Sequence, residues 1–139
     1  MKIVSKKESI ELPKFHFDSD LKEVPDNFEE WKSFCNELKS KLNDPLSLEE
    51  ELQCYEFLGV AKRILRELQE AEAYLQKAVS LAHTYPKISR LIQNLIRLAH
   101  VYQWAGEFEK SQGFFDQAGE LISDLSLIHI SEPTRPLYI

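Results

Sequence analysis

The residues best suited to chemistry stand near the N-terminus, where His16, Asp18 and Asp20 alternate along the chain. On an extended strand this spacing places the three side chains on one side, and imidazole and carboxylate groups are common metal ligands. A metal site needs more ligands and a fixed scaffold. We therefore interpret the segment as a solvated acidic loop, and we predict no metal and no cofactor.

The other polar residues form no recognisable catalytic set. No serine or cysteine lies in a nucleophile motif, and no glycine-rich phosphate loop is present. The remaining histidines, His83, His100 and His129, are dispersed along the chain. We predict that the protein is not an enzyme.

Composition favours a helical protein of one domain. The chain has 139 residues, 43% of them hydrophobic, with only 4 glycines and 6 prolines. Its formal net charge of -6 argues against phosphate-backbone binding, so no nucleic-acid partner is expected. No run approaches the ~18 apolar residues of a membrane span, and a signal-peptide core is absent. We expect a cytoplasmic protein without a membrane partner, in which Cys35 and Cys54 are free buried thiols rather than a disulfide or reactive pair.

The spacing of apolar residues predicts where the chain is helical. Residues 1–25 lack a helical period and are predicted to form an extended or disordered arm that docks Ile10, Leu12, Phe15 and Phe17. A first helix is expected over 26–44, with Asp26 as its cap and Glu29 three residues later. Trp31 and Trp104 lie near apolar stripes, which favours packing over a ligand platform for both.

The rest of the chain is predicted to form two helical hairpins, 47–85 and 87–123. Ser47 and Glu50 have the spacing of a capping box, and a break is expected near Arg66. Pro86 suits the first turn of the fourth helix, and Gly106 suits its end. The fifth helix is expected over 107–123.

Two stretches of the chain repeat each other 40 residues apart. Small residues match small residues, and large apolar residues match large ones. The first set is Leu58, Gly59, Ala71, Leu75, Ala78 and Leu81, and the second is Leu98, Ala99, Ser111, Phe115, Ala118 and Leu121. Such repetition is typical of helical arrays whose neighbouring units stack to bury a core. We expect Gly59 to lie opposite Ala71, with Leu75 filling the groove beside them.

The second copy resembles the tetratricopeptide repeat (TPR) family. The residues that carry the resemblance are Leu98, Ala99, Tyr102, Gly106, Ser111, Phe115 and Ala118. In the first copy Lys62 and Arg66 replace the aromatic residue and the turn glycine of the family. The repeat of the family is about 34 residues long, whereas the repeat of this chain is 40 residues long. The chain therefore resembles a long-period variant of the family. The resemblance implies an all-α fold of antiparallel hairpins in an α-solenoid, preceded by one extra helix and an extended arm.

The resemblance also implies a concave face made by the first helix of each hairpin. The side chains that it points to for binding a partner are Gln53, Glu56, Arg63, Gln93, His100, Gln103 and Trp104, with Val60 and Ile96 between them. Their mixed polar and aromatic character suits a bound peptide or protein segment. The alternative is an ordinary solvated helix surface.

The C-terminal residues have a different character. Residues 125–135 read Leu-Ser-Leu-Ile-His-Ile-Ser-Glu-Pro-Thr-Arg, which resembles the translation of a transposase adapter used in sequencing libraries. We expect residues 125–139 to be non-native and the natural chain to diverge near Asp124. The alternative is a short natural strand over 127–130.

Two functions follow from this sequence. The first is a protein-interaction module, the N-terminal part of a longer repeat scaffold that binds a peptide or protein and stacks on further repeats. The second is a regulatory or sensory arm of a larger enzyme or transcription factor, whose remaining domain follows the repeats. The intact reading frame of the gene would distinguish these two functions, because further repeats favour the scaffold and a different downstream domain favours the arm.

Overall fold

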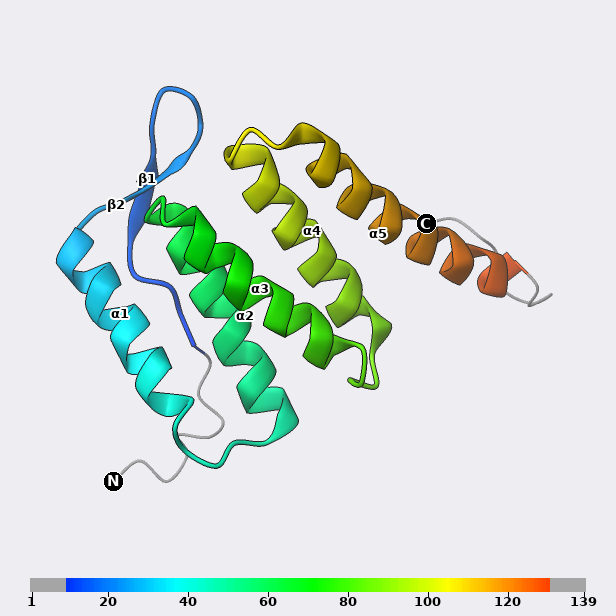
Figure 1. Cartoon of the computed structure of the whole chain (residues 1–139), viewed down its shortest axis with the longest axis horizontal. Helices are drawn as coiled ribbons and strands as arrows, with labels where there is room; N and C mark the ends of the chain where they lie inside the picture. Colours follow the sequence, from blue (N-terminus) through cyan, green and yellow to red (C-terminus); the bar gives the residue numbers. More distant parts are fainter. Residues whose placement is uncertain (1–9, 131–139) are drawn as a thin grey trace.

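The structure, a computed structural model, describes residues 10–130, which form five helices and one two-stranded sheet (Figure 1). The elements are β1 (Phe15–Phe17), β2 (Glu23–Pro25), α1 (Phe28–Lys41), α2 (Leu48–Ile64), α3 (Leu68–Ala82), α4 (Ile88–Trp104) and α5 (Phe108–Ile130). The prediction of a mostly helical chain is confirmed, whereas the sheet was not predicted. Residues 1–9 of the expected arm and 131–139 of the expected tail lie outside the described residues.

The sheet is a β-hairpin within the segment expected to be an extended arm. Strand β1 pairs antiparallel with β2, with Phe15 opposite Pro25 and Phe17 opposite Glu23. The Asp18 carboxylate accepts hydrogen bonds from the backbone N–H groups of Asp20 (2.8 Å) and Lys22 (3.0 Å), and so closes the turn. Pro25 is tolerated because it lies at the end of a strand, where a missing donor costs little.

Helix α1 begins one residue later than its sequence suggested. The cap is Asn27, whose side-chain oxygen accepts the backbone N–H of Glu30 at 3.2 Å. The prediction of Asp26 as the cap is therefore wrong. Asp26 instead lies 2.7 Å from the His16 ring nitrogen, because β2 carries it back to β1.

Replacement of Asn27 by alanine tests this assignment. Loss of the cap leaves a first-turn amide unpaired, so the Asn27→Ala variant should lose about 1 kcal/mol of unfolding free energy. The Asp26→Ala variant should lose less, because its contact with His16 is exposed. Urea unfolding followed by circular dichroism compares the two, and a larger loss for Asp26→Ala would contradict the assignment.

The capping box predicted for α2 is confirmed. The Ser47 hydroxyl accepts the N–H of Glu50 at 3.1 Å, and the Glu50 carboxylate accepts the N–H of Ser47 at 3.0 Å. The break predicted near Arg66 is also confirmed, because α2 ends at Ile64 and α3 begins at Leu68.

The turns that end α2 and α4 have the same construction 40 residues apart. The N–H of Glu67 donates to the carbonyl of Lys62 at 2.8 Å, and that of Glu107 donates to the carbonyl of Tyr102 at 2.8 Å. Each turn contains one residue in the left-handed region, Arg66 at φ 67° and Gly106 at φ 82°. Glycine adopts this conformation freely and arginine does not.

Other helix boundaries also differ from the prediction, and α1 ends at Lys41 rather than at residue 44. Helix α3 ends at Ala82 rather than near Tyr85. Pro86 precedes the α4 cap, Lys87, and so lies outside the helix rather than in its first turn. Helix α5 continues to Ile130, so the alternative of a strand over 127–130 is wrong. The non-native origin expected for residues 125–139 stays a prediction.

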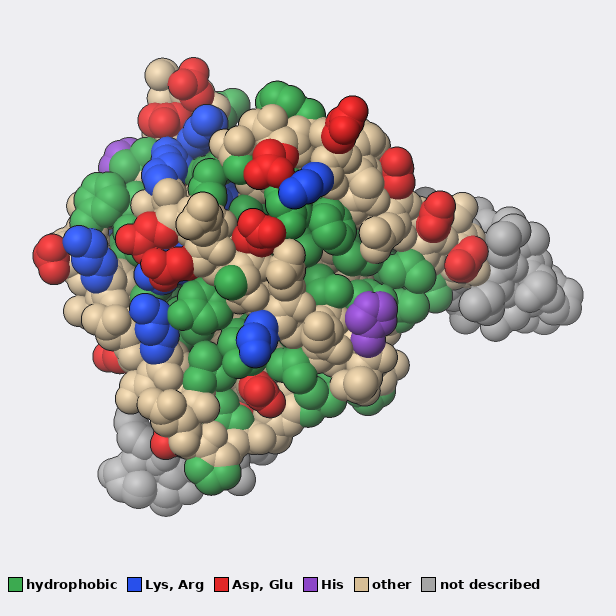
Figure 2. Space-filling model, in the orientation of Figure 1, with side chains coloured by type: hydrophobic (Ala, Val, Ile, Leu, Met, Phe, Trp, Pro, Cys, Tyr) green, Lys and Arg blue, Asp and Glu red, His purple; other side chains and the backbone are tan. Residues whose placement is uncertain are grey.

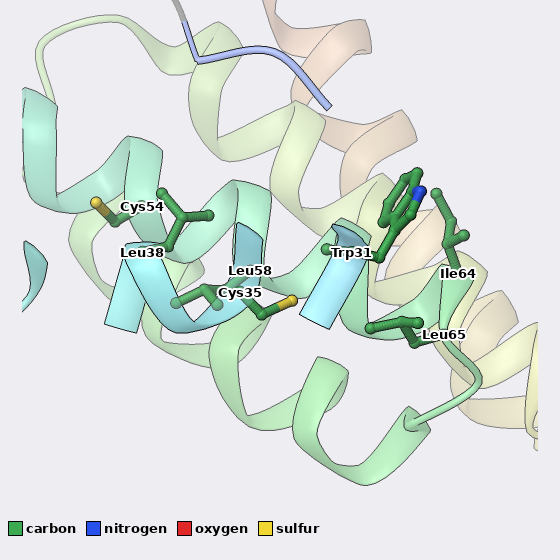
Figure 3. Packing of buried hydrophobic residues seen from close by; sticks show 8 residues of the cluster. Trp31, Cys35, Leu38, Cys54, Leu58, Ile64 and Leu65 are labelled. Atoms are coloured by element: carbon green, nitrogen blue, oxygen red, sulfur yellow. The ribbon is translucent and has the colours of Figure 1, made fainter. Parts of the chain in front are cut away.

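The buried residues form three clusters, which together involve α1 to α5. Trp31, Cys35 and Leu38 of α1 pack on Leu58 and Ile64 of α2 (Figure 3). The Trp31 ring is fully buried, and its Nε1–H donates to the carbonyl of Lys14 at 2.9 Å. The packing role predicted for Trp31 is confirmed. Of the arm residues, Ile10 and Leu12 pack on this cluster, Phe15 makes an edge contact with the Trp31 ring at 6.2 Å between centroids, and Phe17 is exposed.

Several of the repeated positions have similar burial. The pairs Leu58 and Leu98, Ala71 and Ser111, and Ala78 and Ala118 are all buried. Gly59 is opposed most closely by Leu75, since a Cβ atom built on Gly59 would lie 2.3 Å from the Leu75 Cγ. Leu75 therefore faces Gly59 directly, whereas we had expected Ala71 in that position and Leu75 beside it.

Residues 10–130 include no helix with the length and apolar character needed to cross a membrane. Both cysteines are buried and unbonded, and burial raises the pKa of each thiol. Desolvation of the thiolate explains the shift, so the buried thiols are poor nucleophiles at neutral pH.

Candidate partner-binding face

The C-terminal ends of α2 and α4 meet the β-hairpin around an open hollow of about 560 Å³. Figure 1 shows the hairpin lying beside these two helix ends. Four of the seven predicted binding residues line the hollow: Arg63 from α2, and His100, Gln103 and Trp104 from α4. The hairpin contributes Asp20, Leu21, Lys22 and Glu23. We call this site the Trp104 hollow.

Cations surround the indole of Trp104. The guanidinium carbons of Arg63 and Arg66 each lie 4.5 Å from the ring centre, and the Lys22 ammonium lies 5.5 Å away. These distances are typical of cation–π contacts. Trp104 is half-buried and lies outside the core clusters, and its ring contacts Arg63 of α2.

One ion pair ties the hairpin to α2 inside the Trp104 hollow. The Arg63 guanidinium donates to both carboxylate oxygens of Glu23, at 3.1 and 3.3 Å. The two side chains are 14% and 23% exposed, so the pair is largely shielded from water. Burial alone would raise the pKa of Glu23, but the hydrogen bonds and charge of Arg63 outweigh burial and lower it.

His100 enters the Trp104 hollow as a neutral side chain at pH 7. Desolvation and the nearby Arg63 charge both lower the pKa of its imidazole. Its ring makes an edge contact with Phe115 of α5, with 5.5 Å between centroids. His100 can therefore donate or accept a hydrogen bond without adding charge.

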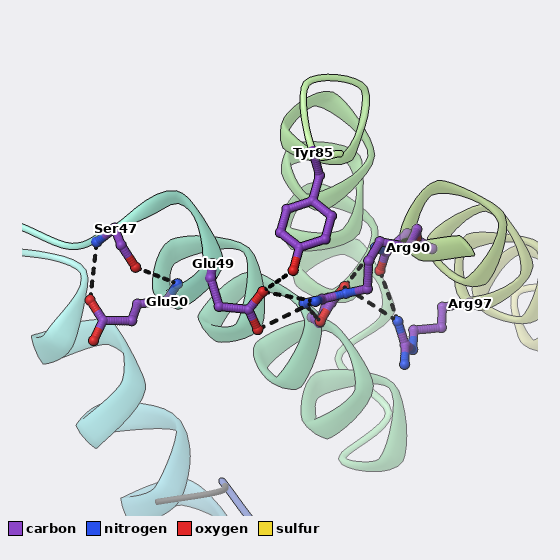
Figure 4. A network of polar contacts seen from close by, with 8 residues as sticks. Ser47, Glu49, Glu50, Tyr85, Arg90 and Arg97 are labelled. Atoms are coloured by element: carbon purple, nitrogen blue, oxygen red, sulfur yellow. Dashed lines mark hydrogen bonds and ion pairs between the residues drawn. The ribbon is translucent and has the colours of Figure 1, made fainter. Parts of the chain in front are cut away.

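Glu56 belongs to a different group of side chains, which joins α2 to α4. Figure 4 shows Arg90, Arg97, Glu49 and Tyr85 of this group. Its carboxylate accepts hydrogen bonds from Arg90 at 2.8 and 3.0 Å and from Asn94 at 2.8 Å, and Arg97 lies 3.6 Å away. Arg90 also donates to Glu49, which accepts a hydrogen bond from the Tyr85 hydroxyl. Since Glu56 is only 6% exposed, its oxygens are committed within the chain.

The two remaining predicted residues lie apart from the Trp104 hollow. Gln53 is half-buried on α2, and Gln93 is exposed near the start of α4. Val60 and Ile96, which the family register also placed on the concave face, are partly buried and pack against the core clusters.

Sequence reasoning missed the hairpin side of the site. The segment that ends in Phe17 and the segment that begins at Glu23 flank Asp18-Ser19-Asp20, a cluster of turn-forming residues. Two short β-prone runs around such a cluster are a hairpin signal. His16, Asp18 and Asp20 act locally in this hairpin, and the part of the chain that the structure describes contains no group of three ligand side chains placed to hold a metal ion.

Comparison of the chain with known protein families, with curated proteins and with solved structures finds no match in any of the three.

Proposed function

We propose that this chain is a protein-interaction module of the cytoplasm, a TPR-like helical scaffold that binds a peptide or protein segment without chemistry. The observation that carries the proposal is the convergence of Arg63, His100, Gln103 and Trp104 on one hollow. An aromatic ring, a guanidinium and two neutral hydrogen-bonding groups are the side chains that anchor protein partners. The 40-residue recurrence of buried positions and turns supports the repeat architecture.

Direct binding tests the proposal. The natural full-length protein is used to capture partners, each candidate is purified, and its affinity is measured by calorimetry. An anchor residue contributes about 2 kcal/mol to the binding free energy, so the Trp104→Ala variant should bind about 30-fold more weakly. Gln112→Ala, on the exposed side of α5, is the control. An unchanged affinity for Trp104→Ala, or substrate turnover in the absence of any partner, would refute the proposal.

The outer face of α5 favours stacking on a further element. Leu68 of α3 packs into the cluster that α4 completes, whereas its counterpart 40 residues later, Phe108, is 67% exposed. Ala82 is 2% exposed and its counterpart Ile122 is 48% exposed. We propose that this face packs against a further repeat or a downstream domain of the natural protein. The regulatory-arm alternative shares this requirement, and the intact reading frame distinguishes the two.

The chain as written should therefore self-associate through α5. Exposed apolar side chains on one helix favour association when no neighbour covers them. The double variant Phe108→Ser/Ile122→Lys should remain monomeric in sedimentation velocity at concentrations where the unchanged chain forms larger species. Gln117→Lys adds the same charge elsewhere on α5 and should change nothing. A monomeric unchanged chain would contradict the prediction.

A further inference from the structure

The hairpin tip, residues 18–23, forms one wall of the Trp104 hollow and contacts the helix side as part of a bound peptide could. It places the Glu23 carboxylate on Arg63 and the Lys22 ammonium beside Trp104. Three carboxylates and one ammonium give the tip a net charge of -2. Arg63 lines the helix side of the hollow and Arg66 lies on the Trp104 ring, so the tip faces cations of opposite charge. Figure 2 shows acidic and basic side chains close together over this end of the molecule.

The tip has little packing of its own to hold it there. Each strand has three residues, and a two-stranded hairpin of this size is only marginally stable in water. Leu21 and Phe17 are 79% and 60% exposed, and the Leu21 backbone is in the left-handed region at φ 64°. The tip is attached to the helices by the Glu23–Arg63 ion pair and by the Lys22–Trp104 contact, and another carboxylate can replace Glu23 in the first of these.

We propose that the hairpin tip is an intramolecular competitor for the Trp104 hollow, and that the partner is an acidic peptide segment whose carboxylate displaces Glu23 from Arg63. This inference rests on the proposed binding function and adds the partner's chemistry and a control on its access. A partner binds only the fraction of molecules in which the tip has left, so its apparent affinity is reduced by that fraction. Weakening the tip raises the affinity without altering the helix side of the site.

The test uses the full chain and a synthetic peptide that copies residues 17–25, labelled with fluorescein. A second peptide carries glutamine in place of the residue that corresponds to Glu23. The protein variants are Glu23→Gln, Glu23→Gln combined with Arg63→Gln, and Glu29→Gln as the control at an exposed carboxylate of α1. Fluorescence anisotropy measures the affinities.

The Glu23→Gln variant should bind the acidic peptide about tenfold more tightly than the unchanged chain, because a charge-assisted bidentate contact no longer holds the tip. The Glu29→Gln variant should match the unchanged chain. The tighter binding should disappear when the glutamine peptide replaces the acidic peptide, and also when Arg63→Gln is added to Glu23→Gln. Either result would show that the peptide carboxylate binds Arg63. Equal affinities for Glu23→Gln and the unchanged chain would overturn the proposal.

Release of the tip is measured separately, without any peptide. Acrylamide is uncharged and quenches exposed tryptophan, and Trp31 is fully buried, so the quenching reports Trp104. Quenching of Trp104 should increase in the Glu23→Gln variant. It should also increase for the unchanged chain in about 1 M salt, because salt screens the ion pair. The salt arm serves as the readout if the variant unfolds, and unchanged quenching in salt would overturn the proposal.

The two proposals fail in different ways. If a purified partner loses affinity with Trp104→Ala but binds Glu23→Gln and the unchanged chain equally, the binding function stands and the competitor role falls. If no partner depends on Trp104, the binding function itself falls.

Discussion

Replacement of Glu56 by alanine is expected to lower the free energy of unfolding by about 3 kcal/mol. The carboxylate accepts hydrogen bonds from Arg90 and Asn94 across the α2–α4 contact. Its removal leaves the shielded Arg90 and Arg97 side chains with fewer compensating charges, and unpaired charge inside a protein is costly. Chemical denaturation with two optical probes measures the loss.

Glu49→Ala is the matched control, because Glu49 also pairs with Arg90 but is 47% exposed. Water and salt screen such a pair, so the expected loss is about 1 kcal/mol or less. Equal losses for the two variants would show that the shielding of Glu56 has no energetic consequence. A partner-binding role for Glu56 would instead appear as weakened binding with unchanged stability.

Substitution at Gly59 should have the opposite effect from substitution at Gly113. A Cβ atom at Gly59 would lie 2.3 Å from Leu75 Cγ, inside a side chain that is 1% exposed. Overpacking of this kind costs about 1–3 kcal/mol. Gly113 has open space around its position, so Gly113→Ala should gain about 1 kcal/mol through helix propensity. Thermal and urea unfolding of the two alanine variants would show the difference.

The double variant Gly59→Ala/Leu75→Ala examines the cause. If the Leu75 side chain is the obstacle, the second substitution removes the overlap, and the combined loss is smaller than the sum of the single losses. Additive losses would show that Gly59 is required for another reason. A stabilised Gly59→Ala variant would contradict the close approach of α2 and α3.

The helices were predictable because their signals are local or periodic. The capping box at Ser47 and the glycine stop at Gly106 need only a few neighbouring residues, and both are found where expected. The cap of α1 was misplaced because Asp26 and Asn27 are equally good candidates. The choice between them depends on β1, which holds Asp26 through His16.

The candidate site was only partly predictable. The repeat register brought four side chains of α2 and α4 to one place, but it carries no information about a hairpin from outside the repeat. The contact of Glu23 with Arg63 joins residues 40 positions apart in sequence that share no pattern. Glu56 and Arg63 lie on the same helix and have similar polarity, so only the packed structure shows that one is committed within the chain.

The left-handed backbone of Arg66 links folding to charge. At the equivalent turn, Gly106 adopts this conformation without strain, whereas Arg66 adopts it with its guanidinium above Trp104. An Arg66→Gly exchange would relax the turn by about 1 kcal/mol and, at the same time, remove a positive charge from the aromatic ring. Selection for a more stable turn favours glycine at this position, whereas selection for positive charge beside the Trp104 ring favours arginine.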